Sequence, residues 1–189
     1  ATWTHEQALQ LVGNDLLESG RVIKEAMRLP QSPAEVVEEL LDGVVARVEE
    51  AVPWCPGAVE LLTSLHDLQV PCALVTMSYE RFVAPILRHL PEGTFPVVVT
   101  GEKVSRGKPH PEPYLTAAAA LGLDPADCVA IEDSGTGATS AEAAGCAVLV
   151  VQNHVPVPAG PRRVFRDTLA GLGPADLAAV LAGVRRGVT

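Results

Sequence analysis

The sequence predicts an α/β fold in which helices cover a mostly parallel sheet. From residue 53 onward, strand-length apolar segments alternate with helical segments, a pattern that forms right-handed β-α-β units. The 189 residues are 48% hydrophobic but only 4% aromatic, so the core is expected to pack from small aliphatic side chains. The expected strands lie within residues 72–78, 95–104, 128–134 and 146–151. Catalytic groups in such folds lie at the carboxyl ends of the strands.

The first 52 residues differ from the rest because they predict helices alone. Residues 4–7 (THEQ) and 32–35 (SPAE) each match a capping box, the second with proline at the first helical position. A less regular helix is expected over 14–30. After the second box, aliphatic residues recur at helical spacing: Val36, Val37, Leu40, Leu41, Val44, Val45 and Val48. Prolines near residue 53 mark a border, so we predict two domains, 1–52 and 53–189.

Charge and hydropathy exclude some classes of partner. The formal net charge is −9 and no basic run occurs, which argues against nucleic acid or an anionic membrane as the main partner. No segment reaches the roughly 18 consecutive apolar residues of a membrane span, and the N-terminal residues do not resemble a signal peptide. Any anionic ligand must therefore be held by local chemistry. The sequence predicts no oligomeric state.

The four cysteines show no C-x-x-C spacing, and three of them lie in or beside strand-like segments. They are Cys55, Cys72, Cys128 and Cys146. We interpret them as buried thiols of a protein in the reducing cytoplasm, in preference to a disulfide or a zinc site.

Polar groups follow two of the expected strands or lie in the loops after them. Thr76 and Ser78 end one strand just before a helix, where hydroxyls and free amides can bind an anion, although a simple helix cap is the commoner role. Lys108 lies between Gly107 and Pro109 ahead of a helix expected near residue 111. Its ammonium suits a phosphate or a carboxylate, and a solvated surface position is the alternative.

Glu132 and Asp133 are adjacent carboxylates at the end of an apolar strand. Like charges at a buried strand end are costly unless a cation or a basic residue offsets them. Hard oxygen ligands favour Mg²⁺ over zinc. The sequence therefore predicts that something positive is held here.

The segment GTG that follows does not complete a dinucleotide-binding motif, because Ser140 occupies the position of the third glycine. We expect its glycines, Gly135 and Gly137, to let the backbone turn tightly into the next helix.

The order and spacing of these pieces are more specific than any one of them. From PGAVELL to GCAVLVV the sequence resembles the haloacid dehalogenase-like phosphohydrolases, in the branch of β-phosphoglucomutase and phosphoglycolate phosphatase. LVTMS resembles their second motif, GKPHPEPY their third and IEDSGTGATSAEAAG their fourth. Residues 1–52 resemble the later part of the helical cap of these enzymes.

The resemblance implies a role for each motif. Asp133 would be a direct Mg²⁺ ligand, and Glu132 a ligand or a partner of one. Thr76, the amide of Met77 and Ser78 would hold the transferring phosphoryl group, and Lys108 would neutralise charge on it. These roles suit phosphoryl transfer, which needs positioning and charge neutralisation.

The family's first motif, an apolar strand that ends in D-x-D-G-T and carries the aspartate nucleophile, is absent from this sequence. In the family that strand lies between the strands of the second and fourth motifs. We therefore expect two strands with unpaired edges and a slot between them, which is costly for a stable domain. The nucleophile is expected upstream of Ala1, and the chain by itself is expected to be inactive.

The resemblance implies a Mg²⁺-dependent phosphatase that acts on a small phosphorylated metabolite through an aspartyl-phosphate. Gly13 and Asn14 resemble the cap loop that faces the substrate, and no arginine stands in this loop as in sugar-phosphate mutases. A phosphatase is therefore preferred to a phosphomutase, the alternative enzyme, and a metal-independent dehalogenase fits the acidic pair less well. A non-catalytic protein that binds a phosphorylated metabolite is the alternative of another class.

Overall fold

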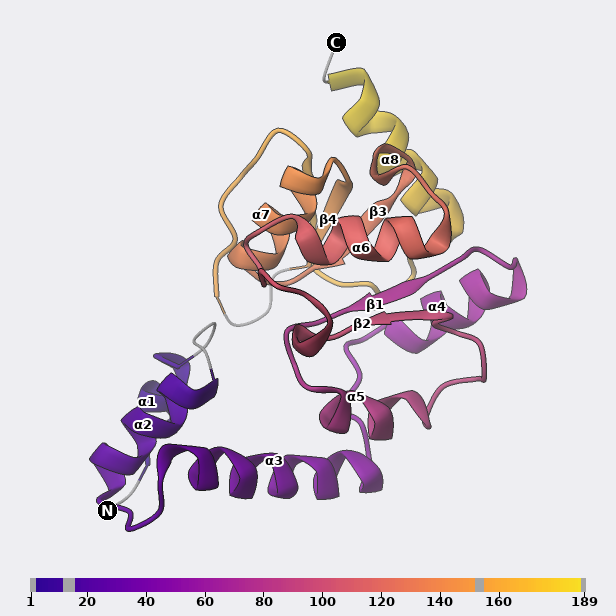
Figure 1. Cartoon of the computed structure of the whole chain (residues 1–189). Helices are drawn as coiled ribbons and strands as arrows, with labels where there is room; N and C mark the ends of the chain where they lie inside the picture. Colours follow the sequence, from indigo (N-terminus) through magenta and orange to yellow (C-terminus); the bar gives the residue numbers. More distant parts are fainter. Residues whose placement is uncertain (1–2, 12–15, 152–154, 188–189) are drawn as a thin grey trace. The chain divides into compact units, whose positions relative to one another are not determined.

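The structure is a computed structural model that describes residues 3–11, 16–151 and 155–187. The chain divides into two compact units, Ala1–Val52 and Pro53–Thr189 (Figure 1). Within the described residues, no helix has the length and apolarity that a membrane crossing needs.

The first unit contains α1 (His5–Leu9), α2 (Leu16–Met27) and α3 (Pro33–Glu50). Both predicted capping boxes are confirmed, at Thr4 and at Ser32. Helices α2 and α3 pack closely at Gly20, where a Cβ atom would lie 2.5 Å from the carbonyl oxygen of Pro33. The assignment of this unit as part of a cap stays a prediction.

The predicted stripe of α3 is only partly correct. Val36, Val37 and Val48 are buried, but Leu40 and Val44 are exposed. Helix α2 covers only part of the apolar stripe of α3, so Leu40 and Val44 remain exposed.

The second unit alternates strands and helices, as predicted. Its elements in order are α4 (Ala58–Asp67), β1 (Ala73–Val75), α5 (Glu80–Leu87), β2 (Val97–Val99), the 3₁₀ turn η1 (Gly101–Lys103), α6 (Glu112–Leu121), η2 (Pro125–Asp127), β3 (Val129–Glu132), α7 (Gly135–Ala144), β4 (Ala147–Val151), β5 (Arg163–Arg166) and α8 (Pro174–Gly187). Strand β5 and helix α8 were not predicted. The strand was missed because its sequence, RVFR, offers only two apolar residues and follows a proline-rich loop.

Every strand pair is parallel, which confirms the predicted fold class, but the strands form two separate sheets. One has the order β1-β2 and the other the order β3-β4-β5. The prediction that the strands of the second and fourth motifs have unpaired edges is confirmed, since β1 and β3 are not hydrogen-bonded to each other.

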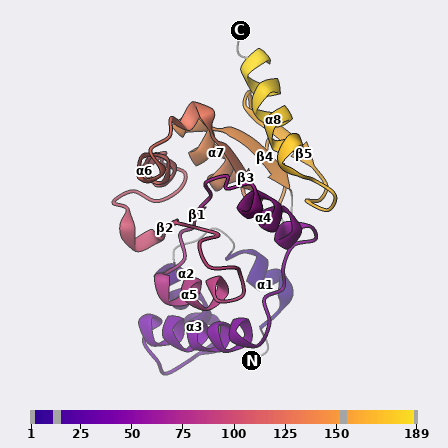
Figure 2. The same ribbon diagram turned by 90° about the vertical axis from the view of Figure 1, so that its right-hand side faces the viewer.

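Strand β4 is the centre of the core. Ala147, Val148, Leu149 and Val150 are all 0% exposed. Leu149 packs with residues of α4 and α8, whereas Val148 and Val150 pack with α7 on the opposite face (Figure 2). Burial of large aliphatic side chains on both faces supplies most of the stabilisation of this sheet.

The edges of β1 and β3 line an apolar cavity of about 640 Å³. Its walls come from α4 and α8 on one face and from α6 on the other. Ile131, in the middle of β3, is 39% exposed although its neighbours on β4 are fully buried. This cavity, here called the slot, lies between β1 and β3, which are not paired with each other.

The interpretation of the cysteines as buried thiols is correct for one of the four. Cys146 is buried, Cys72 and Cys128 are half-buried and Cys55 is exposed, and all four are free thiols. Cys72 and Cys128 line the slot, which explains why neither is fully buried.

Candidate active site

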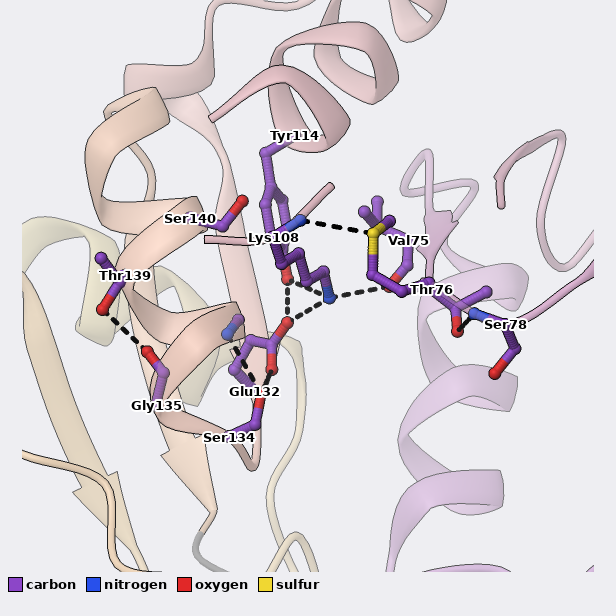
Figure 3. Close-up of polar contacts among 12 residues, drawn as sticks. Val75, Thr76, Ser78, Lys108, Tyr114, Glu132, Ser134, Gly135, Thr139 and Ser140 are labelled. Carbon is purple, nitrogen blue, oxygen red and sulfur yellow. Dashed lines mark hydrogen bonds and ion pairs between the residues drawn. The ribbon is translucent and has the colours of Figure 1, made fainter. Parts of the chain in front are cut away.

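Lys108 is held at the end of a loop that joins β2 to α6. Its ammonium Nζ lies 2.5 Å from Glu132 Oε1 and 3.0 Å from the carbonyl oxygen of Val75. Nζ also donates to Tyr114 Oη at 3.4 Å and lies 5.0 Å from the centroid of the tyrosine ring (Figure 3). The side chain is only 12% exposed. Lys108 is therefore a fixed cation, and the alternative of a solvated surface lysine is wrong.

Hydrogen bonds to Glu112 fix the part of the loop that precedes Lys108. Glu112, in the first turn of α6, accepts hydrogen bonds from the backbone amides of Ser105 at 2.6 Å and Arg106 at 3.1 Å. The hydrogen bond from Ser105 holds the pKa of Glu112 below its usual range, so the carboxylate stays charged at neutral pH.

Glu132 forms an ion pair with Lys108, so the ammonium of Lys108 offsets the negative charge of the buried carboxylate. Its side chain is 6% exposed and lies at the end of β3. Oε1 accepts from Lys108 and from the hydroxyl of Tyr114, and Oε2 accepts from Ser134 Oγ at 3.1 Å (Figure 3). A buried carboxylate with this set of donors satisfies the requirement for paired buried charge.

Gly137 leaves room for the Glu132 carboxylate. A Cβ atom on Gly137 would overlap that carboxylate, whereas a Cβ on Gly135 would meet only Pro158 Cδ at 3.6 Å. Neither glycine has a positive φ. The turn into α7 is short, as expected, but neither glycine makes it through a left-handed conformation, and Gly137 is required for close approach.

Tyr114 provides the hydroxyl that faces Glu132. Burial, together with the negative charge of Glu132, raises the pKa of Tyr114 well above its usual range. The phenol consequently keeps its proton and donates to the carboxylate.

The residues that follow β1 form a turn that is held by hydrogen bonds to the side chains of Thr76 and Met77. Ser78 N donates to Thr76 Oγ1 at 3.0 Å, and the amide of Lys108 donates to Met77 Sδ at 3.3 Å (Figure 3). Gly101 allows this turn to pack against the end of β2, because a Cβ there would lie 2.7 Å from the carbonyl oxygen of Met77. The predicted residues of the second and third motifs are thus in contact.

Asp133 differs from its neighbour because it is exposed and makes no hydrogen bond or ion pair with any residue in the described part of the chain. A single exposed carboxylate fits a hard cation such as Mg²⁺ as one ligand. Among the described residues, no group of three or more His, Cys, Asp and Glu side chains gathers to hold a metal. Further ligands would have to come from substrate, water or other residues.

The structure brings together Thr76, Met77, Ser78, Lys108 and Glu132 at the carboxyl ends of β1 and β3. Gly13 and Asn14, predicted to face the substrate, lie outside the described residues.

Sequence reasoning missed Tyr114 and Ser134. A signal for Tyr114 was available, because it is the one aromatic residue in a helix otherwise rich in alanine. A buried tyrosine usually finds a hydrogen-bond partner.

Comparisons with known proteins bear on residues in both units. The family described as haloacid dehalogenase-like hydrolase matches residues 5–145. Hexitol phosphatase A of Escherichia coli is 38% identical over 131 residues, which cover 68% of this chain and 60% of that protein. Phosphoglycolate phosphatase of Salmonella paratyphi A is 37% identical over 120 residues, which cover 60% of this chain and 48% of that protein. The chain thus spans about half to three fifths of the length of these relatives.

The fold has counterparts among solved structures. The crystal structure of CbbY from Rhodobacter sphaeroides in complex with phosphate superposes with a TM-score of 0.79 at 26% identity, covering 94% of this chain and 84% of the other.

Proposed function

Because this chain belongs to the haloacid dehalogenase-like hydrolases, we propose that it forms most of a Mg²⁺-dependent phosphatase for a small phosphorylated metabolite. Its similarity to two phosphatases of such metabolites supports this class of substrate. The observation that carries the proposal is the position of Lys108, which is anchored by Glu132 at the ends of the two strands that flank the slot.

We further propose that a strand upstream of Ala1 fills the slot and ends in the aspartate nucleophile. A strand between β1 and β3 would end beside Lys108, which already bonds to the last carbonyl of β1. A carboxylate oxygen of that aspartate would attack phosphorus while the ester P–O bond breaks, and the departing alkoxide would take a proton from the second aspartate of the motif. Water would then hydrolyse the aspartyl-phosphate.

The residues of this chain would orient and neutralise the phosphoryl group. Lys108 would offset negative charge on the phosphoryl oxygens and on the attacking carboxylate. The hydroxyls of Thr76 and Ser78 and the amide of Met77 would bind the phosphoryl oxygens at the end of β1. Asp133 would hold Mg²⁺, which supplies further positive charge for these oxygens, and Glu132 would act through Lys108 or as a ligand. We also propose a cytoplasmic location, because the thiols are free.

The test uses a protein extended upstream of Ala1 to include the first motif. We expect it to release phosphate from p-nitrophenyl phosphate, and Asp133→Asn to lower kcat/KM by about 10²-fold or more. Asp167→Asn is the matched control, because Asp167 is an exposed aspartate that follows β5 as Asp133 follows β3. It should keep its activity within about twofold.

Two outcomes would count against the proposal. One is an extended protein that hydrolyses no phosphate ester. The other is equal activity of Asp133→Asn and Asp167→Asn. The 189-residue chain tested alone should show no turnover.

A further inference from the structure

We infer that Tyr114 is a positioning residue that fixes Glu132 as the anchor of Lys108, so that of the adjacent acidic pair only Asp133 is left to bind metal. The consequence for catalysis rests on the proposed function, but the arrangement itself is a property of this chain.

The first step concerns the two oxygens of Glu132. Oε1 receives two donors, the ammonium of Lys108 and the hydroxyl of Tyr114, and Oε2 receives the hydroxyl of Ser134 (Figure 3). The flank of the carboxylate lies against Gly137, with no room for one added carbon atom. A metal ion at Glu132 would have to displace at least one of these donors.

The second step concerns the direction of Glu132. Tyr114 projects from α6, Ser134 is the N-cap of α7, and Lys108 belongs to the loop before α6. The Glu132 carboxylate thus accepts hydrogen bonds from three different segments, whereas Asp133, the next residue, is exposed. Strand β3 ends at Glu132, so the buried carboxylate belongs to the strand and the exposed one to the residue after it.

The third step concerns what the anchor does for Lys108. A lysine loses side-chain conformational freedom when it is fixed in one orientation. Here that loss is already met in the folded chain, because Glu132, Tyr114 and Val75 O surround the ammonium. Lys108 would therefore meet the phosphoryl group in one orientation.

The first experiment measures the reactivity of Lys108 in the 189-residue chain. The sequence has three lysines, Lys24, Lys103 and Lys108, so acetylation by a water-soluble ester can be followed at each by mass spectrometry. We expect Lys108 to react more slowly than Lys103, whose side chain is 43% exposed. Tyr114→Phe should raise the Lys108 rate about threefold and Glu132→Gln about tenfold, since each removes hydrogen bonds to a charged group.

The chain offers a matched control, because its other tyrosine is Tyr79. Tyr79→Phe should leave the Lys108 rate unchanged, and the Lys103 rate should be constant in every variant. Circular dichroism would establish that each variant is folded. If Tyr114→Phe unfolds the chain, Glu132→Gln carries the test. Equal Lys108 rates in wild type and in folded variants would overturn the inference.

The second experiment uses the extended phosphatase. Tyr114→Phe should lower kcat about threefold to tenfold and leave KM and the half-activating Mg²⁺ concentration unchanged, because it disturbs the orientation of Lys108 and no metal ligand. Asp133→Asn should raise the half-activating Mg²⁺ concentration. If Glu132→Gln or Tyr114→Phe raises it as much as Asp133→Asn does, Glu132 is a metal ligand and the inference is wrong. Absence of any phosphatase activity would reject the proposed function and leave the acetylation result valid.

Discussion

Strands β1 and β4 have similar sequences but very different surroundings. Both are short aliphatic strands in a parallel sheet, yet the residues 147–150 of β4 are fully buried and all three residues of β1 are only half-buried. Strand β4 is hydrogen-bonded on both edges, to β3 and β5, whereas β1 is bonded only to β2.

The difference teaches that hydrophobic sequence alone does not bury a strand in this fold. Helices pack on both faces of β4, and α6 packs on β1, so the unpaired edge of β1 contributes to the difference. The unpaired edges of β1 and β3 face the same slot, which therefore separates the two-stranded sheet from the three-stranded sheet. The predictions below test whether the slot is a site for a strand.

The largest effect is expected when the slot is filled. A protein extended to include the first motif should have a free energy of unfolding about 3 to 6 kcal/mol higher than the 189-residue chain, because the strand and the slot bury each other's aliphatic surface. Urea unfolding measures the change. Equal stability of the two proteins would mean that the slot is not a strand site.

Truncation of matched leucines should sharpen the contrast between the two strands. Leu149→Ala in β4 should cost about 3 to 4 kcal/mol, because Leu149 is fully buried. Leu74→Ala in β1 should cost only about 1 kcal/mol in the 189-residue chain, because Leu74 is half-buried beside the slot. In the extended protein, the cost of Leu74→Ala should approach that of Leu149→Ala. Thermal or urea unfolding of these variants and of their two wild-type parents gives the comparison.

A pair of glycines tests how tightly the end of β3 is packed. Gly137→Ala should destabilise the chain by about 2 to 3 kcal/mol, because the new methyl group would meet the Glu132 carboxylate. Gly135→Ala, in the same helix, should be neutral or stabilising by about 0.5 kcal/mol, since its methyl group would make an ordinary contact. A similar cost for both would show that the Glu132 carboxylate is free to move.

The smallest expected effect is a change in the rate at which the cysteine thiols are alkylated, which reports on the slot locally. Cys72 and Cys128 line the slot and should react with iodoacetamide in the 189-residue chain, but about tenfold more slowly once a strand covers them. Cys55 is exposed and does not line the slot, so its rate should stay constant. Burial raises the pKa of the Cys146 thiol to about 12, so Cys146 should stay unmodified at pH 8 in both proteins. Mass spectrometry of the peptides measures each rate.

Much of the fold could be predicted because its signals are local. The capping boxes at Thr4 and Ser32, the strand-length apolar segments and the start of α6 after Pro111 each depend on a few adjacent residues. Strand β5 could not be predicted in this way, because its pairing with β4 depends on the position of the whole sheet. The same holds for Cys72 and Cys128, whose exposure depends on the slot.

The site was predicted in its parts but not in its connections. The residue types of Lys108 and of the acidic pair indicated an anion site beside a cation. That Lys108 is the cation for Glu132 was not predicted, because 24 positions separate the two residues in the chain. Tyr114 was missed for the same reason, since its role depends on a carboxylate from another element.

The sequence by itself determined the class of fold, the order of its elements and the kinds of chemical group available at the strand ends. These follow from periodicity and local hydrogen bonding, which neighbouring residues decide. Only the tertiary structure decided which carboxylate is neutralised, which is left exposed and where the core is open. Those outcomes depend on burial and on contacts between distant segments, and both arise only when the helices and strands pack together.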